Sequence, residues 1–197
     1  VYASAPETVW QAYSESLQAL VNSLAPLETT GLQERTPEPP VWTLIGPDNR
    51  EFGFLVSDDW QIINRDQSQV SVQAPTGNMR FTASNFTWPD ATADPRAAAE
   101  DAVLAHLAEL TRIYTDVQHL PPTEFPLDTT TGATIDFVYL DENGETIAGS
   151  VITGVGNGKM HKIEFTAPTD FYDTALEWFN PMYRSFKFLS PGEGLDD

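Results

Sequence analysis

The stretch IDFVYLDENGETIAGSVITGVGNGKMHKIEFT, residues 135–166, contains three β-type runs separated by two tight turns. The runs are Ile135–Leu140, Thr146–Val155 and Met160–Thr166. β-Branched and aromatic residues, which favour strands, are frequent in all of them. Asn143-Gly144 and Asn157-Gly158 supply the left-handed backbone conformations that tight hairpin turns need. Parallel strands need a crossover of a dozen or more residues, so connections this short predict an antiparallel meander.

Shorter runs of the same kind precede the meander, and turn residues separate them. They are Val41–Ile45, Phe52–Val56, Trp60–Asn64, Val70–Ala74 and Met79–Trp88. Asp, Ser, Pro or Gly bound these runs, and apolar and polar residues partly alternate along them, as they do in half-buried strands. We therefore expect residues 41–88 to add strands to the same antiparallel sheet.

Two segments of the domain have the apolar spacing of helices. The first covers residues 94–116, with Asp94 as its cap and Pro95 in its first turn. The second begins near Asp170, and Pro181 is expected to break it so that Asn180 caps a further short segment. The order of helices and closely spaced strands predicts an α+β fold, a mainly antiparallel β-sheet flanked by helices.

Residues 1–40 form a separate region in this prediction. Residues 6–27 place apolar side chains three and four positions apart, Trp10 among them, which predicts an N-terminal helix. The residues that follow are rich in Thr and Pro and predict an extended linker. We therefore expect a single domain over residues 41–197, preceded by this helix and its linker. The apolar stripe of the helix covers either the domain itself or a partner.

The composition excludes several classes of function. The 197 residues include 10 Lys and Arg but 29 Asp and Glu, which gives a formal net charge of -19. A phosphate backbone would be repelled, so nucleic-acid binding is excluded as the main activity. The sequence has no cysteine, which removes disulfides, thiolate metal sites and cysteine nucleophiles. No apolar stretch is long enough to span a membrane, so we expect membrane contact only through a lipid anchor removed from a longer precursor.

Four motifs in chain order resemble the PsbP/Mog1/DcrB group of α/β/α sandwich proteins. They are Phe52–Trp60, a strand that runs into a turn and a tryptophan; Gly132-Ala133-Thr134; His161–Pro168; and Ser185–Phe188. Their order and spacing over residues 52–189 carry the resemblance. It implies a PsbP/Mog1-like sandwich, used for binding or assembly rather than for a reaction.

The same resemblance implies a non-catalytic accessory or binding protein of the bacterial cell envelope that acts through contacts with a protein partner. The implied location is extracytoplasmic, in the periplasm or at the cell surface, and no cofactor and no catalytic residue are expected. Two alternatives stay open, a hydrolase that uses paired carboxylates and a cation-binding module. Two convergent carboxylates in a deep pocket favour the hydrolase, whereas a shallow apolar patch favours a partner site.

Tryptophans are the candidates for contact with a ligand or partner. Trp88 ends a strand and opens a loop, where its ring either faces solvent or closes the core under the long helix. Trp60 and Trp10 are the other candidates.

Carboxylates in turns are the candidates for a bound cation, because hard cations prefer oxygen ligands. They are Asp58, Asp59, Asp141, Glu142 and Glu145. The alternative interpretation of both groups is a polar turn next to a strand. The second group lies at the Asn143-Gly144 hairpin and lacks the length and spacing of a calcium-binding loop.

Overall fold

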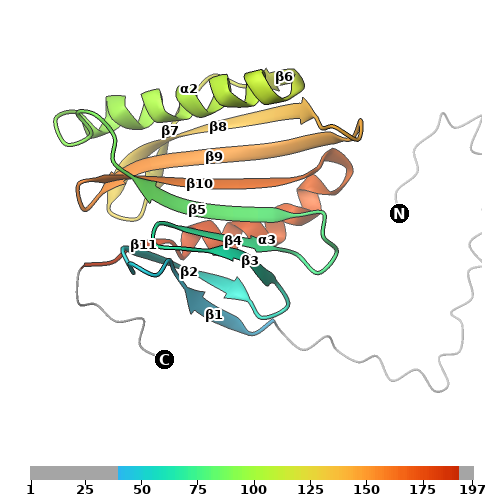
Figure 1. The fold of residues 1–197 in the computed structure, drawn as a ribbon, viewed down its shortest axis with the longest axis horizontal. Coiled ribbons are helices and arrows are strands. Elements are labelled where there is room, and N and C mark those ends of the chain that lie inside the picture. The colour runs from blue at the N-terminus through green and yellow to red at the C-terminus, as the bar shows by residue number, and fades with distance from the viewer. Residues whose placement is uncertain (1–39, 191–197) are drawn as a thin grey trace, which may run out of the picture. The chain divides into compact units, whose positions relative to one another are not determined.

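Figure 1 shows the fold in a computed structural model that describes residues 40–190. Its strands are β1 (Trp42–Ile45), β2 (Phe52–Ser57), β3 (Gln61–Arg65), β4 (Gln69–Gln73), β5 (Arg80–Phe86), β6 (Thr115–His119), β7 (Thr123–Leu127), β8 (Thr130–Leu140), β9 (Thr146–Gly156), β10 (Lys159–Pro168) and β11 (Lys187–Phe188). Its helices are α2 (Pro95–Ile113), the short 3-10 turn η1 (Thr169–Phe171) and α3 (Tyr172–Arg184). These elements belong to a structural unit that begins at Pro40.

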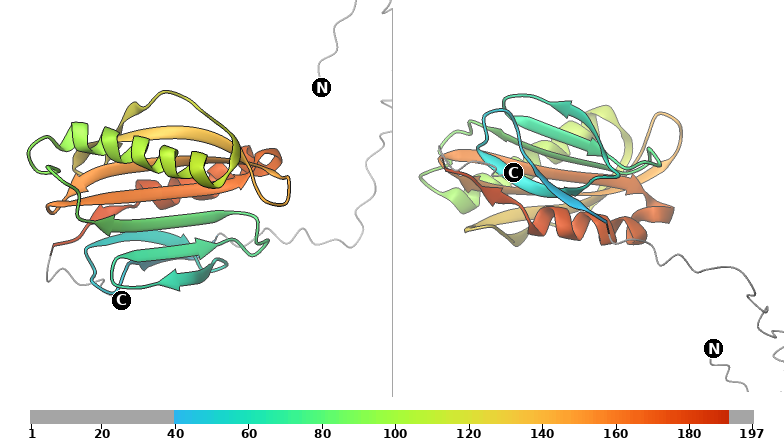
Figure 2. Two further views of the ribbon diagram at one scale, coloured as in Figure 1. Left: turned by 45° about the horizontal axis from the view of Figure 1, so that its top comes forward. Right: turned by 90° about the horizontal axis from the view of Figure 1, so that it is seen from below.

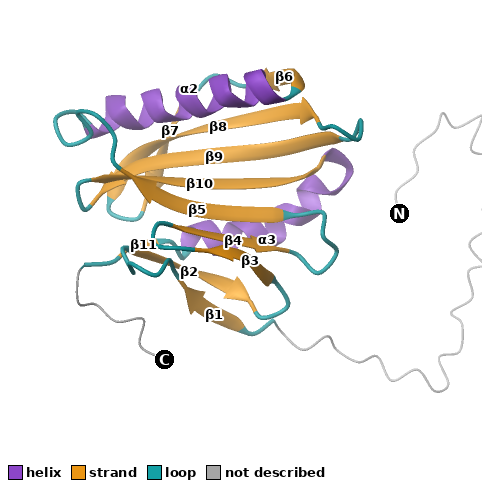
Figure 3. Cartoon of the chain, viewed as in Figure 1, coloured by secondary structure: helices purple, strands orange, loops and turns teal. Residues whose placement is uncertain are grey.

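The predicted meander forms the centre of a large antiparallel sheet, drawn in orange in Figure 3. β8, β9 and β10 pair in sequence order. In the β9–β10 turn both Asn157 and Gly158 are left-handed as expected, whereas in the β8–β9 turn Gly144 is left-handed and Asn143 is not. Gly144 has a φ of 80° and Gly158 a φ of 74°. The strand order is β3-β4-β5-β10-β9-β8-β6, and β7 pairs with β8 beside β6. The predicted α+β class with a mainly antiparallel sheet is confirmed.

Helix α2 covers one face of this sheet, over β8 and β9 (Figures 1 and 2). Asp94 caps the helix as predicted, because its Oδ1 accepts the Ala97 N–H at 3.1 Å. The buried stripe of the helix packs on alternate residues of the two strands. The cluster comprises Ala99, Val103, Leu107, Leu110, Ala133, Ile135, Phe137, Tyr139 and Val151. Burial of this stripe holds the helix on the sheet.

The opposite face of the large sheet carries α3 and a small second sheet. The small sheet has the order β1-β2-β11. The Phe54 ring of β2 lies 4.8 Å from the Phe81 ring of β5. The Phe179 ring of α3 lies 4.4 Å from the Phe165 ring of β10. One hydrophobic core therefore joins α3, the small sheet and this face of the large sheet.

The sequence predicts that β1 and β2 extend the large sheet, but this is wrong, because they lie in the separate small sheet that covers it. Phe52, Phe54 and Val56 alternate along β2 and are all buried in the core shared with β4 and β5. As added edge strands of the large sheet, they could not cover the apolar side chains of β4 and β5. The separate sheet is thus favoured because it buries two apolar faces against each other.

The predicted break at Pro181 is wrong, because α3 runs on to Arg184 with the proline inside it. Proline lacks the N–H that would bond one turn back, which disfavours helix interiors. Burial of Phe179 and Met182 on the two sides of Pro181 holds this last turn helical. Asn180 therefore lies within the helix instead of capping a second segment.

The Pro-rich crossing after the long helix contains two strands that the sequence does not predict. α2 ends at Ile113, because the residues from Thr115 onward form β6 along β8. β7 follows and pairs with the first half of β8, with Pro126 opposite Thr131. A proline is tolerated here because β7 lies at the sheet edge, where an N–H is not needed on the outer side.

The helix predicted for residues 6–27, with its candidate Trp10, lies outside the described residues. Within residues 40–190, neither helix is long and apolar enough to cross a membrane.

Candidate functional site

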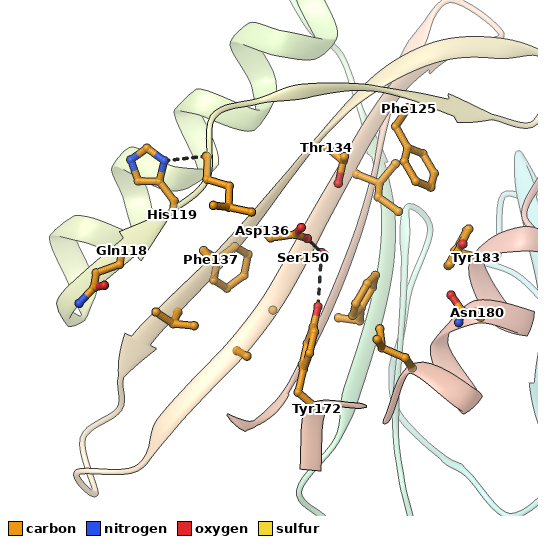
Figure 4. Close-up of a pocket in the computed structure, with 17 residues that line it drawn as sticks. Gln118, His119, Phe125, Thr134, Asp136, Phe137, Ser150, Tyr172, Asn180 and Tyr183 are labelled. Atoms are coloured by element: carbon orange, nitrogen blue, oxygen red, sulfur yellow. Dashed lines mark hydrogen bonds between the residues drawn. The ribbon is translucent and has the colours of Figure 1, made fainter. Parts of the chain in front are cut away.

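A pocket of about 600 Å³ opens on the α3 side of the large sheet. β8 and β9 form its floor, and α3 forms one wall (Figure 4). The end of β6, the loop after it and β7 form the other wall. Volumes of this size are typical of sites for small organic ligands.

The pocket exists because α3 covers β10 but leaves the neighbouring strands open. Successive residues of a strand point to opposite faces. In β8 and β9, one set packs under α2, while the other set forms most of the pocket floor; Phe137 and Gly149 of the first set also reach the lining. The pocket set is Thr134, Asp136 and Val138 of β8 and Ala148, Ser150 and Ile152 of β9. The floor is therefore as rigid as the paired strands that form it.

Helix α3 presents one side to the core and another to the pocket. The pocket side consists of Tyr172, Leu176, Asn180 and Tyr183. These residues are three and four positions apart, so they lie on one side of the helix. Across the pocket, the Phe125 ring of β7 lies 5.5 Å from the Tyr183 ring. Aromatic and aliphatic side chains thus form most of both walls.

Three polar side chains form a hydrogen-bonded chain in the pocket (Figure 4). The Tyr172 hydroxyl donates to Ser150 Oγ at 3.4 Å, and Ser150 Oγ donates to Asp136 Oδ1. Asp136 and Ser150 meet because they are direct partners in the β8–β9 register. Burial, together with the charge of Asp136, raises the pKa of Tyr172 to about 12. The phenol therefore keeps its proton at neutral pH and remains a donor.

Asp136 is the one carboxylate among the described residues that line the pocket, and no Lys or Arg lines it. Within residues 40–190, the Asp136 carboxylate has no ion pair, and its hydrogen bond to Ser150 engages Oδ1 alone. Asp136 is exposed, so its Oδ2 is left to accept from water or from a ligand. A carboxylate hydrolase needs two such groups. The geometry suits instead the binding of an apolar molecule with one polar end.

Neither Trp60 nor Trp88 lines this pocket. Trp60 is 6% exposed, and its ring packs 6.3 Å from Phe179 in the core. Trp88 is half-buried beside Phe86 on the α2 side of the large sheet. There it packs next to Ala98 and Ala102 of α2. This position corresponds to the second of the two alternatives for Trp88, in which its ring closes the core under the long helix.

The first pair of predicted cation ligands lies in the turn after β2. Asp58 accepts a hydrogen bond from Thr43 Oγ1 at 2.5 Å, and Asp59 is exposed. In the part of the chain that the structure describes, no group of three or more His, Asp or Glu side chains is placed to hold a metal ion.

The second group of predicted ligands forms the hairpin between β8 and β9. Asp141 Oδ1 accepts the N–H of Glu145 at 2.8 Å and the N–H of Asn143 at 2.9 Å. These hydrogen bonds, that of Glu145 first, hold the pKa of Asp141 below its usual value. Glu142 and Glu145 are exposed. Asp141 is thus engaged in closing the turn.

The sequence does not single out Asp136, Ser150 or Tyr172, yet it contains a signal for the first two. Asp136 is a charged residue inside an otherwise apolar strand run. Counting outward from the Asn143-Gly144 turn places it opposite Ser150. No comparable signal points to Tyr172, because its place depends on how α3 crosses the sheet.

A second polar cluster lies on the α2 side, and its side chains contact one another. His106 of α2 lies between Lys162 and Glu164 of β10, with Lys162 Nζ 3.3 Å from His106 Nδ1. Glu164 Oε1 is 3.5 Å from His106 Nε2. Burial alone would raise the pKa of Glu164, but the contacts with His106 and Lys162 outweigh it and lower the pKa to about 2. These partners make the cluster a structural one.

The sequence profile of the serine/threonine kinase C-terminal domain family matches residues 45–188. The match runs from the last residue of β1 to β11, so it contains the large sheet, most of the small sheet, both helices and the pocket described above. The chain belongs to this family. The comparison with curated proteins finds no match.

Solved structures share the fold at low sequence identity. Cyanobacterial PsbP (CyanoP) from Synechocystis is 12% identical with a TM-score of 0.60, and the alignment covers 84% of this chain and 100% of that one. The Ran-binding protein Mog1p of Saccharomyces cerevisiae is 11% identical with a TM-score of 0.51, covering 76% of this chain and 96% of that one. The PsbP/Mog1-like sandwich predicted from the four motifs is confirmed.

Proposed function

We propose that this chain is the non-catalytic, ligand-binding C-terminal domain of a serine/threonine kinase, and that the ligand occupies the pocket between α3 and β8–β9. The observation that carries the proposal is the pocket itself. It has about 600 Å³ of space, apolar walls and a hydrogen-bonded polar chain. A concave apolar site with a few convergent polar groups is the usual form of a small-molecule site.

The sequence supports a binding role within a kinase rather than phosphoryl transfer. Its 197 residues contain no His-Arg-Asp triplet, which supplies the base of a kinase catalytic loop. They contain no Asp-Phe-Gly triplet either, which holds the magnesium ion of a kinase. This segment therefore contributes recognition, and occupancy of its pocket is the signal passed to the kinase.

The extracytoplasmic location and the protein partner expected from the sequence belong to the same proposal. A kinase that responds to an external ligand places its binding domain outside the cytoplasmic membrane. A partner chain would find exposed Ile62 and Ile63 on β3, an edge strand whose side chains are all exposed. Such edges are suited to pairing with a strand of another chain.

Binding of the neutral fluorescent amine N-phenyl-1-naphthylamine tests whether the pocket accepts an apolar ligand. We expect saturable binding to the wild-type domain with one site per chain, seen as a rise in dye fluorescence. Leu176→Trp places a larger side chain on the pocket side of α3, so we expect it to weaken binding by about tenfold, equivalent to about 1.4 kcal/mol.

Leu104→Trp is the matched control, because Leu104 is an exposed residue of α2 on the opposite face. It should bind the dye like the wild type. Circular dichroism and thermal melting of both variants establish that they are folded. Absence of dye binding to the wild type, or equal binding to a folded Leu176→Trp variant, would contradict the proposed function.

A further inference from the structure

Tyr172, Ser150 and Asp136 form the polar end of the pocket, where Asp136 carries the negative charge and acceptors outnumber donors. The hydrogen bonds run in one direction, from Tyr172 to Ser150 and from Ser150 to Asp136. Each donor in this chain is thus already directed to a protein acceptor. The chain ends at a carboxylate whose second oxygen has no protein partner within the described residues. The group that a ligand meets there is an acceptor with negative charge.

Among the described residues that line the pocket with Asp136, the one nitrogen base is His119, whose Nδ1 lies 2.9 Å from the Leu120 carbonyl oxygen. None of the described residues that line the pocket is a Lys or Arg. The remaining polar side chains of the lining include Gln118 and Asn180, which are uncharged. A ligand carboxylate or phosphate at this position would face the Asp136 charge with no Lys or Arg among the described lining residues to offset it. An ammonium group would meet an unpaired carboxylate at hydrogen-bond distance, the stronger kind of polar contact.

The rest of the pocket fits an apolar body attached to such a cation. Phe125, Phe165 and Tyr183 line it together with the aliphatic Leu176 and Ile152. Aromatic walls contact a flat ring over a large area at low entropic cost. The formal charge of -19 also raises the local concentration of cations around the chain, which favours their association over that of anions.

We propose that the pocket takes a small organic cation, an amine with an aromatic or aliphatic body, whose ammonium group pairs with Asp136 while its apolar body lies between α3 and β7. The proposal rests on the proposed function, because it assumes that the pocket is the binding site. It goes further by stating the charge of the ligand and the residue that selects it.

Competition among three molecules of similar shape and different charge tests this selection. The probes are tryptamine, which is a cation at pH 7, the neutral alcohol tryptophol and the anion indole-3-acetate. Each is titrated against bound N-phenyl-1-naphthylamine, and the concentration that displaces half of the dye is measured. We expect tryptamine to bind about fivefold more tightly than tryptophol, because its contact is with a partly solvated carboxylate. Indole-3-acetate should bind most weakly.

Asp136→Asn identifies the residue responsible. Asparagine keeps the shape and an acceptor for Ser150 but removes the charge, so tryptamine should lose its advantage while tryptophol binding stays unchanged. Asp101→Asn is the matched control, because it removes one negative charge from an exposed position of α2 on the other face. That control should keep the preference for tryptamine. Raising the salt concentration should weaken tryptamine binding and leave tryptophol unaffected.

The possible results separate this inference from the proposed function. If the dye does not bind the wild-type domain, the proposed function fails, and the charge selection fails with it. If the dye binds and Leu176→Trp weakens it, the pocket is a binding site. In that case, equal displacement by tryptamine and tryptophol, or a preference that survives Asp136→Asn, overturns the charge selection alone.

Discussion

Gly132→Ala is expected to lower the free energy of unfolding by more than about 3 kcal/mol, a large part of the stability of a domain this size. A Cβ atom at this position would lie 1.9 Å from the carbonyl oxygen of Thr153. That atom belongs to the backbone of β9, so β8 and β9 must separate to admit it. Urea unfolding followed by circular dichroism measures the loss, and a thermal midpoint about 10 °C lower should accompany it.

Gly144→Ala is the matched control for this substitution. Gly144 lies in the hairpin turn with a φ of 80°, and a Cβ there meets no atom of the described residues within 4 Å. Its cost comes from the left-handed backbone alone and is about 1 kcal/mol. If the two variants lose similar stability, the close approach of β8 to β9 at Gly132 is wrong, and so is the floor of the pocket that depends on it.

Acidification from pH 6.5 to pH 4 is expected to destabilise the domain by about 3 kcal/mol through His161. His161 is fully buried, and its ring lies 4.7 Å from Phe188 and 5.7 Å from Phe52. Its Nε2 faces the Gly156 carbonyl oxygen at 3.1 Å, while Nδ1 has no hydrogen-bond partner among residues 40–190. Burial lowers the pKa of His161 to about 4 from its ordinary 6.5.

The sign of the effect follows from these two pKa values. Below pH 6.5 the unfolded chain binds a proton at His161, but the folded chain does not until the pH nears 4. Protonation therefore favours the unfolded state across this window, and the free energy of unfolding decreases as the pH decreases. Glu164, with its pKa lowered to about 2, adds a separate loss below pH 4.5.

His161→Phe isolates the contribution of the histidine. The substitution keeps an aromatic ring in the same apolar surroundings and cannot take up a proton. Urea unfolding at intervals between pH 7 and pH 4.5 should give a shallower fall in stability for this variant than for the wild type. Equal slopes would show that His161 does not titrate in the way its burial requires.

Most of the fold could be predicted because it depends on local signals. The Asn-Gly turns set the β8–β9–β10 meander, and Asp94 sets the start of α2. The separate small sheet could not be predicted, because it depends on which apolar face β2 covers. The continuation of α3 past Pro181 could not be predicted either, because burial of its side chains outweighs the local preference of proline to end a helix.

The pocket was harder to predict than the fold because it is a gap left by packing. Its floor follows from strand alternation, and Asp136 opposite Ser150 could be found by counting from the hairpin turn. Its walls depend on the angle at which α3 crosses β10 and on the unpredicted strands β6 and β7. Trp60, Trp88 and the turn carboxylates, which were marked by residue type, lie elsewhere, in packed or solvent-exposed positions.

NMR spectra of the methyl-labelled domain with bound N-phenyl-1-naphthylamine locate the ligand directly. If the pocket between α3 and β8–β9 is the binding site, nuclear Overhauser effects will connect the dye to the methyl groups of Leu176 and Ile152. Val103 and Leu107 of α2, which pack on the other face of the sheet, will show none. Contacts to Val103 and Leu107 in place of Leu176 and Ile152 would contradict the assignment of this pocket as the site.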